Sequence, residues 1–501
     1  MAILSKLAHN MGLQILTTNC YETIHTWEPD CYKAILVASP NGFLFSLKTY
    51  LTFYLRNCDN ILPANENRLH QIHDLRASYM GNNIWKISTF FAIQITTMIS
   101  KKGDPRKVDW KRFGVDVLRS SIFLTTNLLL FQFFLCRIRH LLGFFTIPTM
   151  GLISSAMASF CAILIEKQAR RPALALYTTN LASETLFRQL CNHGYLSHIK
   201  YGECIPFAIG IGLFAKLQSQ GTLDPSIQKL LNYTHCIKPD EEILSSKWVP
   251  NDFHVLLRRL RNDFGRSPRC VHKHSCASTA IESFVRNFAI GTGVSALLVF
   301  VRNLKNIFSN PLKVARLLLS WSNLRLPLFF GLLPLLFHVS HLTFRDENDV
   351  ISTTTRCLLN RVPFCPVEVS ETAAGVISGF SMLPYRSVTI AMYTMWKGIE
   401  VMYRKWMEQG LVPSVPYGDI ILYTISTGYV LWQTVIEPQA LRKGYLNFLL
   451  GITGNRIKVF NRDLYEHFGF QSKLLYPNAK PQLNTRYCTL NPMLYQGVMP
   501  C

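Results

Sequence analysis

Blocks of apolar residues, separated by short charged segments, dominate the pattern of this chain. The clearest block, Leu141 to Ile165, has no charged residue between Arg139 and Glu166. Crossing the apolar core of a bilayer, about 30 Å thick, takes about 20 apolar residues in a helix. The block therefore predicts a helix that spans a membrane.

Other uncharged blocks predict more helices. Residues 326–344 are long enough to span, and Pro327 and Pro334 predict kinks within them. Shorter blocks lie at 120–136, 420–436 and 287–301, and the shortest, at 87–100, 204–215 and 372–385, are more typical of interfacial or re-entrant helices. This pattern predicts an all-α fold, specifically a polytopic helical membrane protein.

One polar passage occurs twice. Residues 170–203 align without a gap on residues 386–419 after a shift of 216 positions, with nine identities in 34 positions. The identities are mostly polar residues or glycine, and they fall at positions 170, 175, 177, 178, 184, 188, 194, 201 and 202 of the first copy. Two unrelated apolar helices would match at Leu and Ala instead, so the pattern predicts two internal repeats.

Each copy carries a polar stripe along one helix face. At about 100° per residue, an arginine, a tyrosine, a glutamate and a second arginine fall within about 40° of one another. These residues are Arg170, Tyr177, Glu184 and Arg188 in the first stripe, and Arg386, Tyr393, Glu400 and Arg404 in the second. Three interpretations are open: packing where the two halves meet, the lining of a polar groove for a lipid or peptide, or a helix lying on the membrane surface.

The blocks and the repeats together predict five segments. Residues 1–32 form an N-terminal segment with Cys and His, and residues 33–217 form a first membrane half with its repeat copy at 141–216. Residues 218–279 form a polar basic loop, residues 280–437 a second membrane half with its copy at 371–436, and residues 438–501 an extramembrane tail. Five membrane crossings would separate equivalent points of the two copies. Because five is an odd number, the two copies would have opposite orientations in the membrane.

Composition agrees with a membrane protein. Hydrophobic residues make up 49% of the chain and charged residues 16%, whereas soluble domains carry about 25% charged residues. The net charge of +22 fits loops that face the cytosol or anionic lipid. Nucleic-acid binding would need a basic face on a folded soluble domain, and the sequence shows none, so we expect no nucleic-acid partner.

The cysteines and histidines suggest one candidate for chemistry. The 14 cysteines are scattered, which is typical of reduced thiols rather than a disulfide framework. Two clusters contain residue types that bind zinc: Cys20, His25 and Cys31, and then Cys270, His272, His274 and Cys276. The alternation in the second cluster is unusual for one tetrahedral ion, so a reduced, basic loop is the plainer interpretation.

The sequence contains no enzyme motif that we recognise. A glycine-rich phosphate loop, a GxSxG elbow and an HExxH helix are all missing. We therefore expect no catalytic residues and, apart from zinc, no cofactor.

Several strings of residues are specific enough to indicate a protein family. They are Asn19–Glu22, His25–Trp27, Ala162–Glu166 and Asn180–Arg188 in the first half, and Ala374–Gly375, Ser381–Met382, Ile425–Thr427, Leu441–Arg442, Asn461–Arg462 and Phe468–Gly469 in the second. These strings resemble the transmembrane protein 135 family. The resemblance covers most of the chain from Cys20 to about Arg486, but it is poor over residues 218–267.

The resemblance implies a function that the residue pattern does not. Members of the family are multi-pass proteins of peroxisomal and mitochondrial membranes, also linked to lipid droplets, and their repeat resembles that of mitochondrial translocase channel subunits. They are associated with the balance of mitochondrial fission and fusion and with the handling of cholesterol or fatty acids, without enzymatic activity. Two alternatives are a lipid or metabolite conduit lined by the polar stripes, and an adaptor that recruits a fission GTPase.

Overall fold

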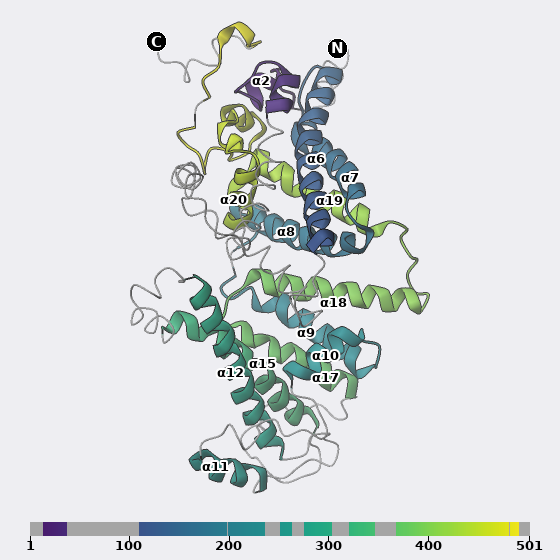
Figure 1. Cartoon of the computed structure of the whole chain (residues 1–501), viewed down its shortest axis with the longest axis vertical. Coiled ribbons are helices and arrows are strands. Elements are labelled where there is room, and N and C mark those ends of the chain that lie inside the picture. Colours follow the sequence, from purple (N-terminus) through teal and green to yellow (C-terminus); the bar gives the residue numbers. More distant parts are fainter. Residues whose placement is uncertain are drawn as a thin grey trace, which may run out of the picture. The chain divides into compact units, whose positions relative to one another are not determined.

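All the secondary structure that the structure describes is helical, apart from one antiparallel bridge between Leu16 and Phe145. The structure is a computed structural model (Figure 1), and it describes residues 14–37, 110–197, 199–235, 251–262, 275–302, 320–345, 367–479 and 481–489. The all-α class predicted from the sequence is confirmed. The predicted helix at 87–100 lies outside these residues.

The chain divides into two compact units. The first unit combines residues 1–197 with residues 416–501, and the second consists of residues 198–415. Each unit therefore contains helices from both halves of the sequence.

The first unit is built on four long helices. They are α6 (Trp110–Leu142), α7 (Ile153–Ile165), α8 (Arg171–Asn192) and α19 (Gly418–Ile436). Helix α19 packs against both α7 and α8, and α6 packs against α7. Shorter elements complete the unit: α2 (Cys20–Thr23), η3 (Pro148–Leu152), η4 (Gln168–Arg170), η7 (Pro438–Ala440), α20 (Lys443–Ile452), η8 (Arg456–Val459), η9 (Arg462–Phe468) and η10 (Thr485–Tyr487).

The predicted span at 141–165 is wrong at its start. Helix α6 continues to Leu142 and ends where Gly143 adopts a φ of 84°. The next helical turn begins at Pro148, whose missing N–H is tolerated in the first turn of a helix. Glycine takes a positive φ without steric cost. A glycine and a proline thus divide one uncharged block into the end of α6 and a shorter helix.

The second unit contains α9 (Cys204–Ser219), α10 (Pro225–Thr234), α11 (Asn251–Asn262), α12 (Cys276–Arg302), α15 (Trp321–Arg345), α17 (Val367–Ser378), η6 (Gly379–Met382) and α18 (Val388–Glu408). Helix α9 packs against α17 and α18, and α15 packs against α12 and α17. The segment predicted as a polar loop, 218–279, contains helices α10 and α11. Leu231 of α10 belongs to a buried apolar cluster, so this part of the segment is integral to the unit.

The shift of 216 residues also relates contacts between helices. When 216 is added to the residue numbers of α7, α8 and α9, the resulting ranges overlap those of α17, α18 and α19. Helices α7 and α8 pack on α19, and α17 and α18 pack on α9, so each pair lies beside a helix from the other half. The backbone corresponds too: φ is positive at Gly194 and Gly410 (77° and 70°) and at Tyr201 and Tyr417 (66° and 57°). The duplication and the orientation of the copies stay predictions from the sequence.

Four of the described helices are long and apolar enough to cross a membrane. Their spans are Leu118–Leu142, Pro148–Ile165, Ala277–Phe300 and Trp321–Val339. The polytopic membrane character predicted from the sequence is therefore confirmed. Helix α19, predicted as a span at 420–436, is not among the four, and about half of its residues are buried within the first unit.

Candidate functional site

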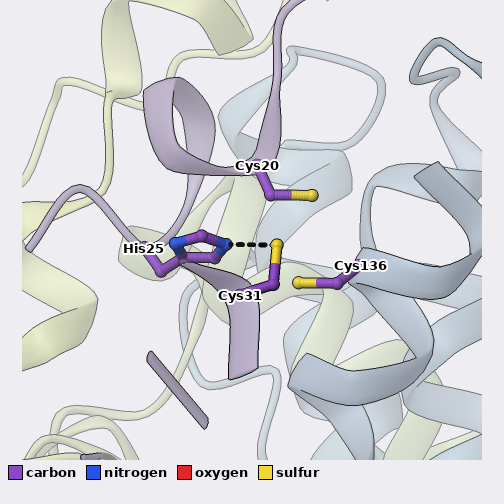
Figure 2. A group of neighbouring side chains, drawn as sticks. All are labelled: Cys20, His25, Cys31 and Cys136. Atoms are coloured by element: carbon purple, nitrogen blue, oxygen red, sulfur yellow. Dashed lines mark hydrogen bonds between the residues drawn. The ribbon is translucent and has the colours of Figure 1, made fainter. Parts of the chain in front are cut away.

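Three cysteines and one histidine converge in the first unit. The Sγ atoms of Cys20, Cys31 and Cys136 and a ring nitrogen of His25 all lie within 4.8 Å of one another. Figure 2 shows the four side chains pointing toward a common centre. Cys20, His25 and Cys136 are buried, and Cys31 is half-buried. Among the described residues, this is the group of side chains best suited to hold a metal ion.

Local hydrogen bonds position the N-terminal ligands. Asn19 caps α2: its side chain accepts from the backbone N–H of Glu22, and the Glu22 side chain accepts from the N–H of Asn19. This reciprocal capping box satisfies two backbone donors at the helix start. It fixes the short helix that begins at Cys20, and the chain then turns so that His25 and Cys31 face the same point.

The histidine ring has a defined orientation. The Nδ1 atom of His25 lies 2.7 Å from the carbonyl oxygen of Glu28. A carbonyl oxygen can only accept, so Nδ1 carries a proton, and Nε2 is the ring nitrogen that faces the cysteines. Nε2 lies 3.3 Å from Sγ of Cys31. Metal-binding histidines are commonly oriented in this way, with the other ring nitrogen donating to a carbonyl.

Hydrogen bonds in the cluster favour a thiolate at Cys31. Hydrogen bonds from Cys136 and then Cys20 lower the pKa of Cys31, and His25 acts in the same direction. Arg139 adds a positive charge beside Cys20 and donates to the backbone carbonyls of Thr17 and Thr18 at 2.7 Å each. A thiolate is the form of cysteine that binds metals.

The structure brings Cys20, His25 and Cys31 together and adds Cys136, a fourth partner that was not predicted from the sequence. Metal binding by these residues stays a prediction. Cys136 lies on an apolar helix, far along the chain from the other three residues. The only feature of the sequence that could have indicated its role is that this cysteine precedes an arginine, Arg137. Of the second predicted cluster, Cys270, His272 and His274 lie outside the described residues. Cys276 begins α12, and its side chain also lies outside the described part.

The first polar stripe centres on a buried carboxylate. Glu184 on α8 has a side chain only 3% exposed. Its Oε1 accepts from Arg188 at 2.6 Å, and its Oε2 accepts from Nε of Arg442 at 3.0 Å and from the same guanidinium's Nη2. Tyr177 is exposed. Arg442 follows α19 and lies 258 residues from Glu184, and it was not predicted from the sequence as a partner of the stripe.

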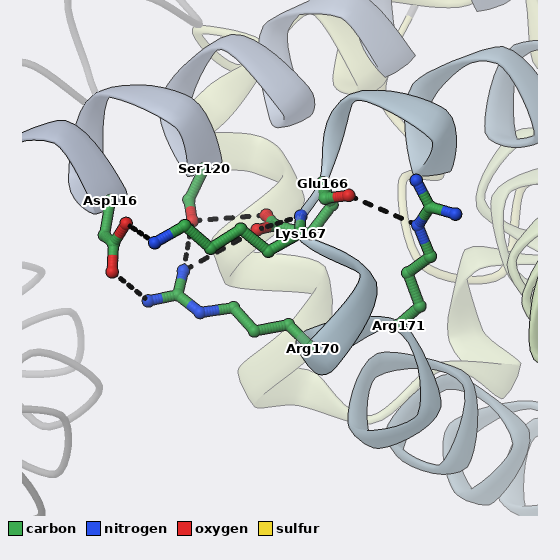
Figure 3. A network of polar contacts seen from close by, with 6 residues as sticks. All are labelled: Asp116, Ser120, Glu166, Lys167, Arg170 and Arg171. Carbon is green, nitrogen blue, oxygen red and sulfur yellow. Dashed lines mark hydrogen bonds and ion pairs between the residues drawn. The ribbon is translucent and has the colours of Figure 1, made fainter.

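Arg170 takes part in a separate ionic network, shown in Figure 3. It pairs with Asp116 of α6 at 3.4 Å and with the buried Glu166 at 3.7 Å. Lys167 also pairs with Asp116, and the Ser120 hydroxyl donates to Glu166 at 3.3 Å. Asp116 and Ser120 come from α6 and the other residues from the end of α7 and the following turn, so the network joins these elements.

The second stripe is more exposed. Glu400 has a side chain 23% exposed and pairs with Lys397 at 2.8 Å and with Arg404. Arg386 precedes α18, which begins at Val388, so it is not on the helix as predicted; its guanidinium lies 4.1 Å from the ring centre of Tyr201. Tyr393 is exposed. The two stripes belong to different units.

Comparison with known proteins gives one family match. Residues 72–191 match the model of the N-terminal cysteine-rich region of Transmembrane protein 135. The matched region contains Cys136 and the first polar stripe. No solved structure matches the chain. The match supports the family resemblance seen in the sequence.

Proposed function

On the premise that the chain is a multi-pass membrane protein of the transmembrane protein 135 family, we propose that it acts in peroxisomal and mitochondrial membranes. There it influences the balance of mitochondrial fission and fusion and the handling of cholesterol or fatty acids, without catalysis of its own. The family match over residues 72–191 carries this proposal. The four helices of membrane-spanning length support an integral membrane location.

The contacts of the polar stripes favour packing over a conduit. Glu184 is buried between Arg188 and Arg442, and Glu400 has Lys397 and Arg404 as partners. Each carboxylate is therefore compensated within its own unit. A charge pair of this kind needs no transported ligand to stabilise it.

A second candidate function is recruitment of fission machinery through α11. Val255, Leu256, Arg258 and Arg259 of this helix are exposed, while Leu257 is buried. Arg261 donates to both carboxylate oxygens of Glu282 on α12 at 2.9 Å, which fixes the helix on the unit. An anchored helix with an exposed basic pair is a suitable docking element for an acidic partner surface.

Depletion and rescue in cultured cells test the proposal. Cells that lack the chain are expected to show altered mitochondrial length and altered sterol or fatty-acid content, and wild-type protein should restore both. A tagged copy is expected to colocalise with peroxisomal and mitochondrial markers. Unchanged mitochondria and lipids after depletion would contradict the proposal.

The charge reversals Arg258→Glu and Arg259→Glu separate the second candidate from the first. If α11 recruits fission machinery, this variant should reach the same membranes but fail to restore mitochondrial length. A matched control reverses Lys443 and Lys458, which lie in the first unit. Full rescue by the α11 variant would rule out recruitment through this helix.

A further inference from the structure

We propose that Cys20, His25, Cys31 and Cys136 bind one Zn²⁺ ion that fastens the N-terminal segment to helix α6. The four ligand atoms already lie within 4.8 Å of one another. Three of them come from one short segment, and the fourth comes from a helix of membrane-spanning length. The site does not depend on the family role proposed above.

The spacing of the ligand atoms fits a tetrahedral ion. Zinc lies about 2.3 Å from a cysteine sulfur and about 2.0 Å from a histidine nitrogen, so ligand atoms in a tetrahedral site are about 3.5–3.8 Å apart. The distance from Cys31 Sγ to His25 Nε2 is 3.3 Å. Since all four atoms lie within 4.8 Å of one another, shifts of about 1 Å would bring them to the spacing of a tetrahedral site.

The ligand types identify the metal and its role. Three sulfur ligands and one imidazole form a soft tetrahedral set, which favours zinc over magnesium or calcium. Four protein ligands leave no position for water or substrate, as in structural zinc sites. Three thiolates and Zn²⁺ leave one negative charge, and Arg139 lies beside Cys20 to compensate for it. Binding would release the protons of the thiols that are still protonated.

The site also explains how distant segments of the first unit are joined. The carbonyl oxygen of Thr23, between Cys20 and His25, accepts from the N–H of Asn461 and from the Tyr465 hydroxyl at 3.1 Å each. The Thr26 hydroxyl donates to the carbonyl oxygen of Val459 at 2.8 Å. A metal ion that holds the loop between Cys20 and Cys31 therefore also holds the surface on which residues 459–465 dock.

Metal analysis of the full chain in detergent tests this proposal directly. Protein purified without chelators is expected to contain about one zinc ion per chain, and X-ray absorption should show three sulfur ligands and one nitrogen ligand. The triple variant Cys20→Ser, Cys31→Ser, Cys136→Ser should lose the zinc. Cys161→Ser and Cys191→Ser, which alter cysteines of α7 and α8 outside the cluster, should retain it.

Chelation provides a second readout that needs no variant. Removing zinc from the wild-type protein should speed proteolysis of residues 14–37 and 453–489, while fragments of the second unit keep their rate. Wild-type protein without stoichiometric zinc, zinc retained by the triple variant, or a disulfide between two of the three cysteines in the purified protein would each overturn the proposal.

Discussion

Glu184 and Glu400 occupy the same position of the two polar stripes but have different surroundings. The Glu184 side chain is 3% exposed and touches Arg442, a cation supplied by the chain after α19. The Glu400 side chain is 23% exposed, and its partners come from its own helix. Removing one member of a buried ion pair leaves an uncompensated charge, whereas exposed pairs contribute little.

We therefore expect unequal effects from the same substitution. Glu184→Gln should lower the free energy of unfolding by about 2 kcal/mol, because Arg442 and Arg188 lose their shared counter-charge. Glu400→Gln, the matched control, should cost less than about 1 kcal/mol. Thermal unfolding of both purified variants in one detergent measures the difference. Equal losses would show that burial of Glu184 has no energetic consequence.

At the scale of elements, close approach of helices depends on glycine. A Cβ atom at Gly210 of α9 would lie 2.6 Å from the backbone carbon of Thr394 on α18. The corresponding atom at Gly293 of α12 would meet nothing within 4 Å. The packing of α9 on α18 thus requires a residue without a side chain, and the exposed face of α12 does not.

This contrast predicts opposite signs for two alanine substitutions. Gly210→Ala should destabilise the second unit by about 1–3 kcal/mol, because the backbones must separate. Gly293→Ala should be neutral or stabilise by up to about 1 kcal/mol, because alanine favours the helix. Hydrogen exchange in α9 and α18 would report the loss locally. Unchanged exchange in Gly210→Ala would contradict the close contact.

At the scale of the whole molecule, the two halves of the sequence complete each other's units. Helix α9 from the first half packs on α17 and α18, and α19 from the second half packs on α7 and α8. The apolar surface of each helix pair is covered by a helix encoded on the other side of the segment 218–279. Each half of the sequence therefore supplies a helix that covers a helix pair of the other half.

Cleavage between the halves tests this arrangement. A protease site inserted within residues 236–250 should yield two fragments that stay together during purification in mild detergent, because α9 and α19 remain packed. Each fragment expressed alone should aggregate or be degraded. Size-exclusion chromatography before and after cleavage measures the association. Separation of the cleaved fragments would show that the exchanged helices do not hold the halves together.

The helical class, the membrane-spanning character and the residue types of both candidate sites could be predicted from the sequence. These follow from spacing between near neighbours, because a helix, its cap and its apolar length are encoded locally. Only the folded chain shows which distant residues meet: Cys136 lies beside Cys20, Arg442 beside Glu184, and α19 beside α8. Such pairings depend on how the apolar surfaces of separate helices cover one another. The spacing of residues along the chain does not predict which helices pack together.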